Sequence, residues 1–214
     1  MNNKFSVDED GGWQQILNRP AVTFAKRPAL FIDRDGVLIE ERHYLKNPSE
    51  VKLLPYAAET IKQANTEKII VVIVTNQGGI GRQLLNWNDF YAVQERLLDD
   101  LATEGAFINA VYACPHHPKG AQPYNIGDHS WRKPNPGMIL KALDDLDIDP
   151  AKSAMIGDKA SDLRAAKRAG LKTGVHVLTG HGMDDGERTG AKKLKSPDFN
   201  VLCHDDLKDV KLNF

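Results

Sequence analysis

The chain has 214 residues, of which 41% are hydrophobic and 27% are charged, as in an ordinary soluble globular protein with one well-filled core. Its formal net charge of −1 gives no general attraction for nucleic acid or for an acidic membrane surface. No apolar stretch approaches the roughly 20 residues that a membrane-spanning helix needs. We therefore expect a protein that binds neither nucleic acid nor a membrane.

The composition of the first residues and the number of cysteines indicate the cellular compartment in which the protein works. Residues 1–12 are polar and acidic, without the basic and apolar regions of a signal peptide. Two cysteines, Cys114 and Cys203, cannot build a disulfide framework. We therefore expect the protein to work in the reducing cytoplasm.

Residues 1–28 are expected to form an N-terminal extension that precedes one domain over residues 29–214. In this extension Trp13, Ile16 and Leu17 have the spacing of one face of a short helix, which would dock on the domain. The extension contains no motif that indicates a function.

Apolar strands alternate with amphipathic helices through the rest of the chain. The clearest strand is a run of six β-branched residues at 69–74, and helical patterns run over 88–104 and 160–169. Further apolar runs, each typical of a strand buried on both faces, lie at 29–32, 110–113, 153–157 and 174–178. This alternation predicts an α/β fold with a doubly wound, mostly parallel, Rossmann-like sheet. Because the helical faces are used against the sheet, we expect a monomer.

Two aspartates follow the first of these strands. The run 29–32 ends in Asp33-Arg34-Asp35-Gly36, in which glycine lets the chain turn without a Cβ clash. Alone, this pattern is typical of a solvated turn at a strand end. At the carboxyl edge of a parallel sheet, two carboxylates instead favour a divalent cation such as Mg²⁺, and an aspartate bound to it can act as a nucleophile.

Other polar groups lie at comparable places, after a strand or before a helix. They are Thr75 with Asn76, Arg132 with Lys133, and Asp158 with Lys159. The strand ends of a doubly wound sheet meet at one edge, so we expect these groups to converge on the two aspartates.

The combined set suits the transfer of a phosphoryl group. Asp33 would attack phosphorus, while Asp35 would protonate the leaving oxygen and then activate water. Asp33, Asp158 and the backbone carbonyl oxygen of Asp35 would hold Mg²⁺, which lets a carboxylate approach an anionic phosphate. The Thr75 hydroxyl, nearby backbone N–H groups and Lys133 would hold the phosphoryl oxygens.

Five motifs occur in order over about residues 29–182. They are Asp33-Arg34-Asp35-Gly36-Val37, Thr75-Asn76-Gln77-Gly78-Gly79-Ile80-Gly81-Arg82, Cys114-Pro115-His116-His117-Pro118, Arg132-Lys133-Pro134-Asn135-Pro136-Gly137-Met138 and Gly157-Asp158-Lys159. The chain thereby resembles haloacid dehalogenase-like phosphatases, and most closely the D-glycero-D-manno-heptose 1,7-bisphosphate 7-phosphatase family and its histidinol-phosphate phosphatase relatives.

The resemblance implies a capless or nearly capless domain that depends on Mg²⁺. It implies hydrolysis of a small sugar-phosphate monoester through an aspartyl-phosphate, with the 7-phosphate of a heptose bisphosphate as the expected substrate. It further implies contacts to substrate from Glu41, Arg42, His43, Tyr44, Thr75, Asn76, Gln77, Gly78, Arg132, Lys133 and Lys159.

The chain departs from the family pattern in the proline- and histidine-rich segment 114–135, which lacks periodicity and is expected to be a long loop. The family usually holds a structural zinc there through Cys-x-His followed by Cys-x-Cys. Cys114 and His116 match the first pair, but the second falls at His129 and Trp131, and tryptophan cannot ligate zinc. A closed site needs four ligands. We therefore expect a loop packed by its aromatic side chains rather than a zinc site, with His117 or Asp128 as alternative fourth ligands.

Three other functions remain open. Hydrolysis of histidinol phosphate or another small phosphoester would use the same residues, so only substrate profiling separates it from the sugar reaction. A catalytically silent phosphosugar-binding domain would keep the fold, although none of the catalytic groups is missing here. A nucleic-acid 3′-phosphatase is disfavoured by the neutral charge and the lack of a basic, aromatic groove.

Overall fold

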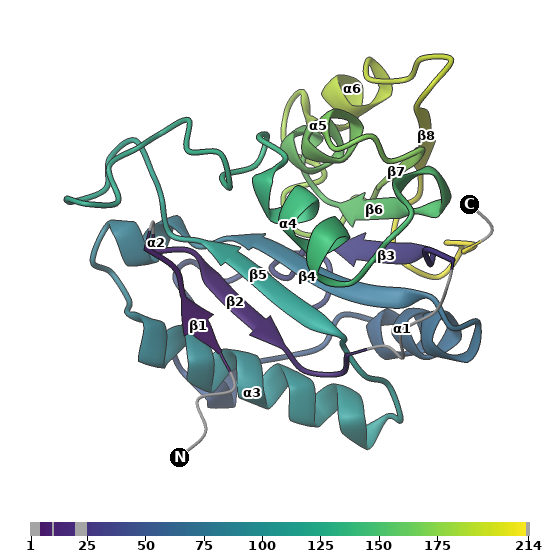
Figure 1. Ribbon diagram of the computed structural model, residues 1–214. Coiled ribbons are helices and arrows are strands. Elements are labelled where there is room, and N and C mark those ends of the chain that lie inside the picture. The colour runs from purple at the N-terminus through teal and green to yellow at the C-terminus, as the bar shows by residue number, and fades with distance from the viewer. Residues whose placement is uncertain (1–4, 10, 20–24, 213–214) are drawn as a thin grey trace.

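A computed structural model describes residues 5–9, 11–19 and 25–212. In this part of the chain, eight strands form one sheet in the order β1-β2-β5-β4-β3-β6-β7-β8 (Figure 1). Their bounds are Ser6–Val7 (β1), Trp13–Ile16 (β2), Ala29–Ile32 (β3), Ile70–Asn76 (β4), Ala110–Cys114 (β5), Ala154–Gly157 (β6), Thr173–His176 (β7) and Asn200–Cys203 (β8).

The six strands from β3 to β8 run parallel to one another, as the sequence predicts. The chain moves outward from β3 to β4 and β5, and then returns to place β6 on the other side of β3. This reversal makes the carboxyl ends of β3, β4 and β6 the natural place for a ligand crevice.

Helices cover both faces of the sheet, because successive residues of each buried strand point to opposite faces and both sets are apolar. In β3, Leu30 and Ile32 belong to the core under α1 (Ala57–Thr66) and α3 (Trp87–Thr103). Ala29 and Phe31 point into the opposite core, under α4 (Gly137–Asp145), α5 (Ala160–Arg168) and α6 (Glu187–Lys192). Strands that are buried on both faces are apolar throughout, which is why they could be recognised as continuous apolar runs. The predicted fold class is confirmed.

The connections where a cap domain could be inserted contain only turns, loops and short helices among the described residues. Between β3 and α1 the chain forms turns and one 3₁₀ helix, η1 (Pro48–Glu50). The short helix α2 (Gly78–Gly81) follows β4, and a second 3₁₀ helix, η2 (Pro150–Lys152), precedes β6. Residues 115–136, between β5 and α4, form neither helix nor strand and extend away from the sheet at the upper left of Figure 1. The described residues thus contain no separate cap domain, and none of their helices has the length and apolar character for crossing a bilayer.

The short helix expected around Trp13 is wrong, because this segment is the strand β2. It pairs antiparallel with β5, so that Trp13 lies opposite Ala113 and Ile16 opposite Ala110. The exposed edge of β5 offers backbone hydrogen bonds that a docked helix would leave unused. Trp13 is fully buried, and its ring stacks on Phe5 with centroids 3.8 Å apart. Residues 13–16 therefore belong to the same sheet as the strands that follow residue 28.

Candidate functional site

The carboxyl ends of β3, β4 and β6 border a cavity of about 460 Å³. All the residues predicted to contact substrate line it, namely Glu41, Arg42, His43, Tyr44, Thr75, Asn76, Gln77, Gly78, Arg132, Lys133 and Lys159. Five further lining residues with polar side chains had no role predicted from the sequence, namely Arg34, Arg82, Ser161, Asp162 and His181, and His117, considered there only as a zinc ligand, also lines the cavity. Segments far apart in the sequence thus meet at one edge of the sheet, as expected for a doubly wound fold.

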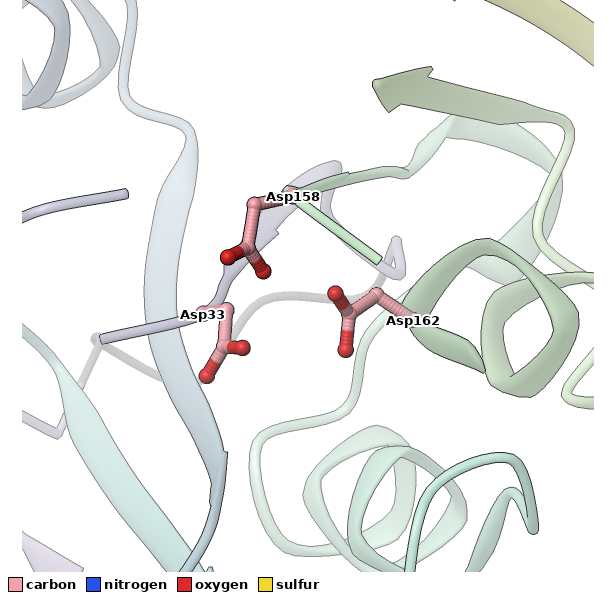
Figure 2. A group of neighbouring side chains, drawn as sticks. All are labelled: Asp33, Asp158 and Asp162. Atoms are coloured by element: carbon pink, nitrogen blue, oxygen red, sulfur yellow. The ribbon is translucent and has the colours of Figure 1, made fainter. Parts of the chain in front are cut away.

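Three buried carboxylates lie at the bottom of this edge. Asp33 follows β3, Asp158 follows β6, and Asp162 lies in the first turn of α5. Figure 2 shows the three side chains pointing toward one another, and an oxygen of each lies within 4.8 Å of the others. Within the described ranges, one oxygen of Asp158 (Oδ1) is buried without a hydrogen-bond partner. Closely spaced carboxylates with an unused buried oxygen fit a hard divalent cation.

Asp162 is the member of this cluster that the sequence analysis missed. It stands four residues after Asp158, at the third position of α5, where its Oδ2 accepts a hydrogen bond from the backbone N–H of Lys159 at 3.0 Å. An aspartate in a first helical turn is ordinary capping chemistry, so its residue type alone did not indicate a site. The spacing of four after a strand-terminal Gly-Asp is the signal that could have found it.

Lys133 supplies the positive charge beside the cluster. Its Nζ lies 3.0 Å from Asp33 Oδ2 and 2.7 Å from Asp162 Oδ1, and it donates to the backbone carbonyl oxygen of Val74 at 2.9 Å. The backbone N–H and C=O of Lys133 both bond to the side-chain amide of Asn76, each at 3.0 Å. Asn76, at the end of β4, therefore fixes the loop that brings the ammonium group into the site.

The Asp35 carboxylate faces a different set of partners. Arg34 approaches both of its oxygens at 3.0 to 3.2 Å, and Gln77 Nε2 donates to Asp35 Oδ2 at 2.8 Å. Gln77 also donates to the Thr75 hydroxyl at 2.9 Å, which itself lies 3.5 Å from Asp35 Oδ2. The side chain of Asp35 thus stands outside the carboxylate cluster, next to the threonine, and only its backbone carbonyl oxygen was expected at a metal.

Two glycines allow the backbone to approach Asp158. Gly36 has φ +82°, and a Cβ atom there would lie 2.6 Å from Asp158 Oδ2. Gly180 has φ +57°, and its Cβ would lie 2.4 Å from the same oxygen. The next residue, His181, donates its backbone N–H to this oxygen at 2.8 Å. A side chain at either position would collide with the Asp158 carboxylate, so glycine is needed for the backbone to come this close.

Burial changes the proton affinity of the whole cluster. It raises the pKa of Asp33 to about 6, with Lys133 opposing and Asp162 adding to the effect. It raises the pKa of Asp158 to about 8, where the charges of Asp162 and Asp33 add to it. For Lys133, burial opposes the charged form, but the charges of Asp162 and Asp33 outweigh burial and raise its pKa. A cation that enters the metal-free cluster near neutral pH must therefore displace protons.

Known proteins share this architecture. Residues 130–210 match the HAD-hydrolase-like family model. D-glycero-β-D-manno-heptose-1,7-bisphosphate 7-phosphatase from Mesorhizobium japonicum is 46% identical over 147 residues, which cover 69% of this chain and 68% of that protein. The chain belongs to the D-glycero-D-manno-heptose 1,7-bisphosphate 7-phosphatase family.

Solved structures place the family within the HAD-like hydrolases. A HAD-like protein from Mesorhizobium loti superimposes with a TM-score of 0.79 at 39% identity, covering 91% of this chain and 88% of that one. D,D-heptose 1,7-bisphosphate phosphatase from B. bronchiseptica, complexed with magnesium and phosphate, gives a TM-score of 0.69 at 29% identity and covers 85% and 93% of the two chains. The fold and the family agree with the sequence motifs.

The loop after β3 makes a contact between distant segments. Tyr44, with φ +55°, lies under the guanidinium of Arg82, whose carbon is 5.4 Å from the ring centroid. Arg82 Nη1 also donates to the Tyr44 hydroxyl. Gly79 leaves room for this tyrosine, because a Cβ there would lie 2.7 Å from its ring. The loop after β3 and the helix α2 after β4 thus form one wall of the cavity.

The loop in which the family usually holds zinc is packed by rings. His116 and His129 stack with centroids 3.7 Å apart and planes 6° from parallel. Trp131, in the place of a ligand, packs edge-on against Tyr112 of β5 at 6.0 Å. Burial raises the pKa of the Cys114 thiol to about 12, which favours its protonated form. Within residues 5–9, 11–19 and 25–212, the acidic cluster is the only group of three ligand side chains within 4.8 Å of one another, so Cys114, His116 and His129 do not form one.

We predict that the purified protein contains far less than one zinc ion per chain, because only three of the family's four ligand positions hold a suitable residue. Elemental analysis after dialysis measures this directly. Chelation should leave the melting temperature of the protein unchanged when no divalent cation has been added. Zinc at near one equivalent, with a loss of stability on chelation, would contradict this prediction.

We predict that the stability of the metal-free protein contains a contribution from Asp158 that falls as pH rises from about 4 to about 8. Because its pKa is raised, the folded protein holds more protons than the unfolded chain in this window, so deprotonation favours unfolding. Urea denaturation at several pH values, with chelator present, should therefore show a smaller fall for Asp158→Asn than for the unmodified protein. The exposed Asp198→Asn serves as the matched control and should keep the full fall. Identical slopes for both variants would disprove the assignment.

Proposed function

We propose that this protein is a Mg²⁺-dependent phosphatase that hydrolyses a sugar-phosphate monoester, with the 7-phosphate of D-glycero-D-manno-heptose 1,7-bisphosphate as substrate. The observation that carries the proposal is the position of Asp33, which belongs to the acidic cluster and lies 3.0 Å from the Lys133 ammonium at the cavity edge. The names of the M. japonicum and B. bronchiseptica relatives support this substrate, and the magnesium and phosphate bound in the latter support the cofactor and the reaction.

The residues present fit a magnesium ion. Asp33, Asp158 and Asp162 offer carboxylate oxygens, and the backbone carbonyl of Asp35 is the further oxygen that the sequence motif provides. When bound, the ion neutralises charge on the phosphate and so allows a carboxylate to approach it. Gly36 and Gly180, which carry no side chain, let the backbone lie close to the Asp158 carboxylate at this site.

The reaction then divides into two displacements at phosphorus. An oxygen of Asp33 attacks the phosphorus, the bond from phosphorus to the sugar oxygen breaks, and Asp35 gives that oxygen a proton. In the second step Asp35 takes a proton from water, the water oxygen attacks the aspartyl-phosphate at phosphorus, and phosphate leaves with Asp33 restored. Lys133 and the Thr75 hydroxyl hold the phosphoryl oxygens through both steps.

Residues around the opening of the cavity are proposed to bind the sugar and its second phosphate. Arg132 is directed by a hydrogen bond from its Nη1 to the backbone carbonyl oxygen of His116 at 2.8 Å. Its guanidinium and the Lys159 ammonium suit an anionic group, whereas Glu41 suits sugar hydroxyls. Residues 42–44 and 76–78 complete the wall. All the proposed catalytic groups lie within residues 29–214, which agrees with a single phosphatase domain, and we propose that it acts as a cytoplasmic monomer.

The residues of this site also bear on the two alternative functions. Histidinol phosphate would use the same catalytic groups, and only the names of the relatives favour the heptose. A silent phosphosugar-binding domain would not need a buried lysine beside a strand-terminal aspartate, and both are present here.

We predict that Asp33→Asn lowers kcat by on the order of 10⁴-fold or more, because an amide cannot form the acyl-phosphate. Circular dichroism and the melting temperature should show that the variant remains folded. Asp198→Asn, which changes an exposed aspartate in the same way, should keep full activity. Retention of more than a tenth of the activity by Asp33→Asn would rule out the aspartyl-phosphate route.

We predict the highest kcat/KM for heptose 1,7-bisphosphate in a screen of phosphorylated sugars and histidinol phosphate with Mg²⁺. A substrate that has one phosphate would leave the cations Arg132 and Lys159 without an anionic partner, so monophosphates should be at least about tenfold poorer. Phosphate release measures each rate. A preference for histidinol phosphate would support the alternative, and failure to hydrolyse any phosphoester despite tight binding would support the silent domain.

A further inference from the structure

Arg34 is a buried cation that the proposed reaction does not use. It stands between the two catalytic aspartates in sequence, yet it is only 2% exposed. Its backbone N–H donates to Asp33 Oδ1 at 2.8 Å, while its side chain turns to Asp35. A fully buried arginine is rare unless its charge is paired, so its position requires an explanation.

The guanidinium of Arg34 donates hydrogen bonds to both carboxylate oxygens of Asp35. Nη2 lies 3.0 Å from each oxygen and Nε lies 3.2 Å from each, so the carboxylate is held by two nitrogens at once. Gln77 adds a single hydrogen bond at 2.8 Å. The near-equal distances show that the line between the two oxygens crosses the line between Nε and Nη2, so each nitrogen is shared by both oxygens and the carboxylate is restricted in place and in rotation.

Aromatic rings hold the guanidinium in turn. Its carbon lies 4.8 Å from the ring centroid of Phe90 in α3, and Phe90 is fully buried. Trp13 of β2 meets Phe90 edge-on at 5.1 Å, and Trp87 meets both rings, at 5.5 Å from Phe90 and 5.2 Å from Trp13. We call Phe90, Trp13 and Trp87 the aromatic brace. Arginine stacks on aromatic faces because its planar guanidinium is weakly hydrated.

One nitrogen of this guanidinium is left unsatisfied. Arg34 Nη1 is buried and makes no hydrogen bond to any residue that the structure describes. A buried donor without a partner costs stability, so packing alone does not account for an arginine here. A contribution to the chemistry of Asp35 does account for it.

We propose that Arg34 is a positioning residue that orients the carboxylate of Asp35 for proton transfer, and that the aromatic brace, including Trp13 from the N-terminal strand β2, keeps Arg34 in place. This proposal rests on the proposed phosphatase function. General acid catalysis depends on a protonated carboxyl group whose O–H points at the leaving oxygen, so a small rotation of Asp35 reduces the rate of that step.

The test uses two leaving groups in the first displacement. A sugar oxygen must be protonated as it leaves, whereas nitrophenolate leaves without a proton, so only the first reaction needs an aligned Asp35. Arg34→Lys keeps the charge but offers one nitrogen where the guanidinium offers two, so it cannot restrict the rotation of Asp35 in the same way. We expect it to slow phosphoenzyme formation from the sugar phosphate by about 100-fold and from p-nitrophenyl phosphate by less than about fivefold. Single-turnover quenched flow measures both rates without interference from breakdown of the phosphoenzyme.

The brace is tested with a matched pair of core substitutions. Phe90→Leu removes the ring under Arg34, and Phe199→Leu removes an equally buried ring from the core on the opposite face of the sheet. Phe90→Leu should show the same selective loss with the sugar phosphate, about tenfold, whereas Phe199→Leu should lower the melting temperature and leave both first-turnover rates unchanged.

Equal loss with both substrates in Arg34→Lys, or no loss with either, would overturn the proposal, because a purely structural arginine would not distinguish between leaving groups. These results remain interpretable if Phe90→Leu fails to fold, since Arg34→Lys alone decides the point. Failure of the phosphatase proposal is separate, because the unmodified protein would then form no phosphoenzyme from either substrate.

Discussion

The contact between the Lys133 ammonium and two aspartates, Asp33 and Asp162, is the interaction on which the site depends. Three carboxylates that share a buried edge repel one another, and burial penalises each of their charges. One ammonium group, at 2.7 Å from Asp162 and 3.0 Å from Asp33, offsets part of that repulsion. Burial, together with the repulsion that remains, raises the pKa values of Asp33 and Asp158 in the metal-free cluster, and such a set of carboxylates fits a divalent cation.

The sheet topology makes this contact available. Asp33 and Asp158 end two neighbouring parallel strands, β3 and β6, so their backbones are fixed by strand pairing. Lys133 arrives on a loop, and the paired hydrogen bonds of Asn76 attach that loop to the end of β4. Rigid strands thus position the proposed nucleophile, while most of the residues proposed to contact the sugar lie on the loops around it. This division is common in α/β enzymes, because loops can change without disturbing the core.

Sequence analysis predicted most of this arrangement for a physical reason. Apolar strands that end abruptly in polar residues reveal both the sheet and its functional edge, and Asp33, Thr75 and Asp158 are all of this kind. Asp162 was not predicted as a site residue, because helix capping already explains a carboxylate in the first turn of a helix. The strand β2 was taken for a helix because three apolar positions in a short segment fit either period, and only the unpaired edge of β5 decides between them.

Long-range pairing is the other information that the sequence did not reveal. Arg34 follows Asp33 in a turn, where an exposed charge is the ordinary expectation, and its burial depends on Phe90, which lies more than fifty residues away in the chain. The contact between Tyr44 and Arg82 joins two loops in the same way. Such contacts depend on how the loops meet in space, which periodicity and residue type do not record.

The short hairpin of β1 and β2 has a consequence for how copies of this protein behave at high concentration. β5 is buried along its whole length and is apolar. A sheet that ended at β5 would therefore expose an apolar edge strand with unpaired backbone groups, to which another chain could add a strand. β2 occupies that edge, and the outermost strand, β1, offers only two residues, both exposed. Among the residues that the structure describes, β1 gives a neighbouring molecule few backbone hydrogen bonds for extending the sheet, which disfavours strand addition at this edge, while β8 forms the opposite one.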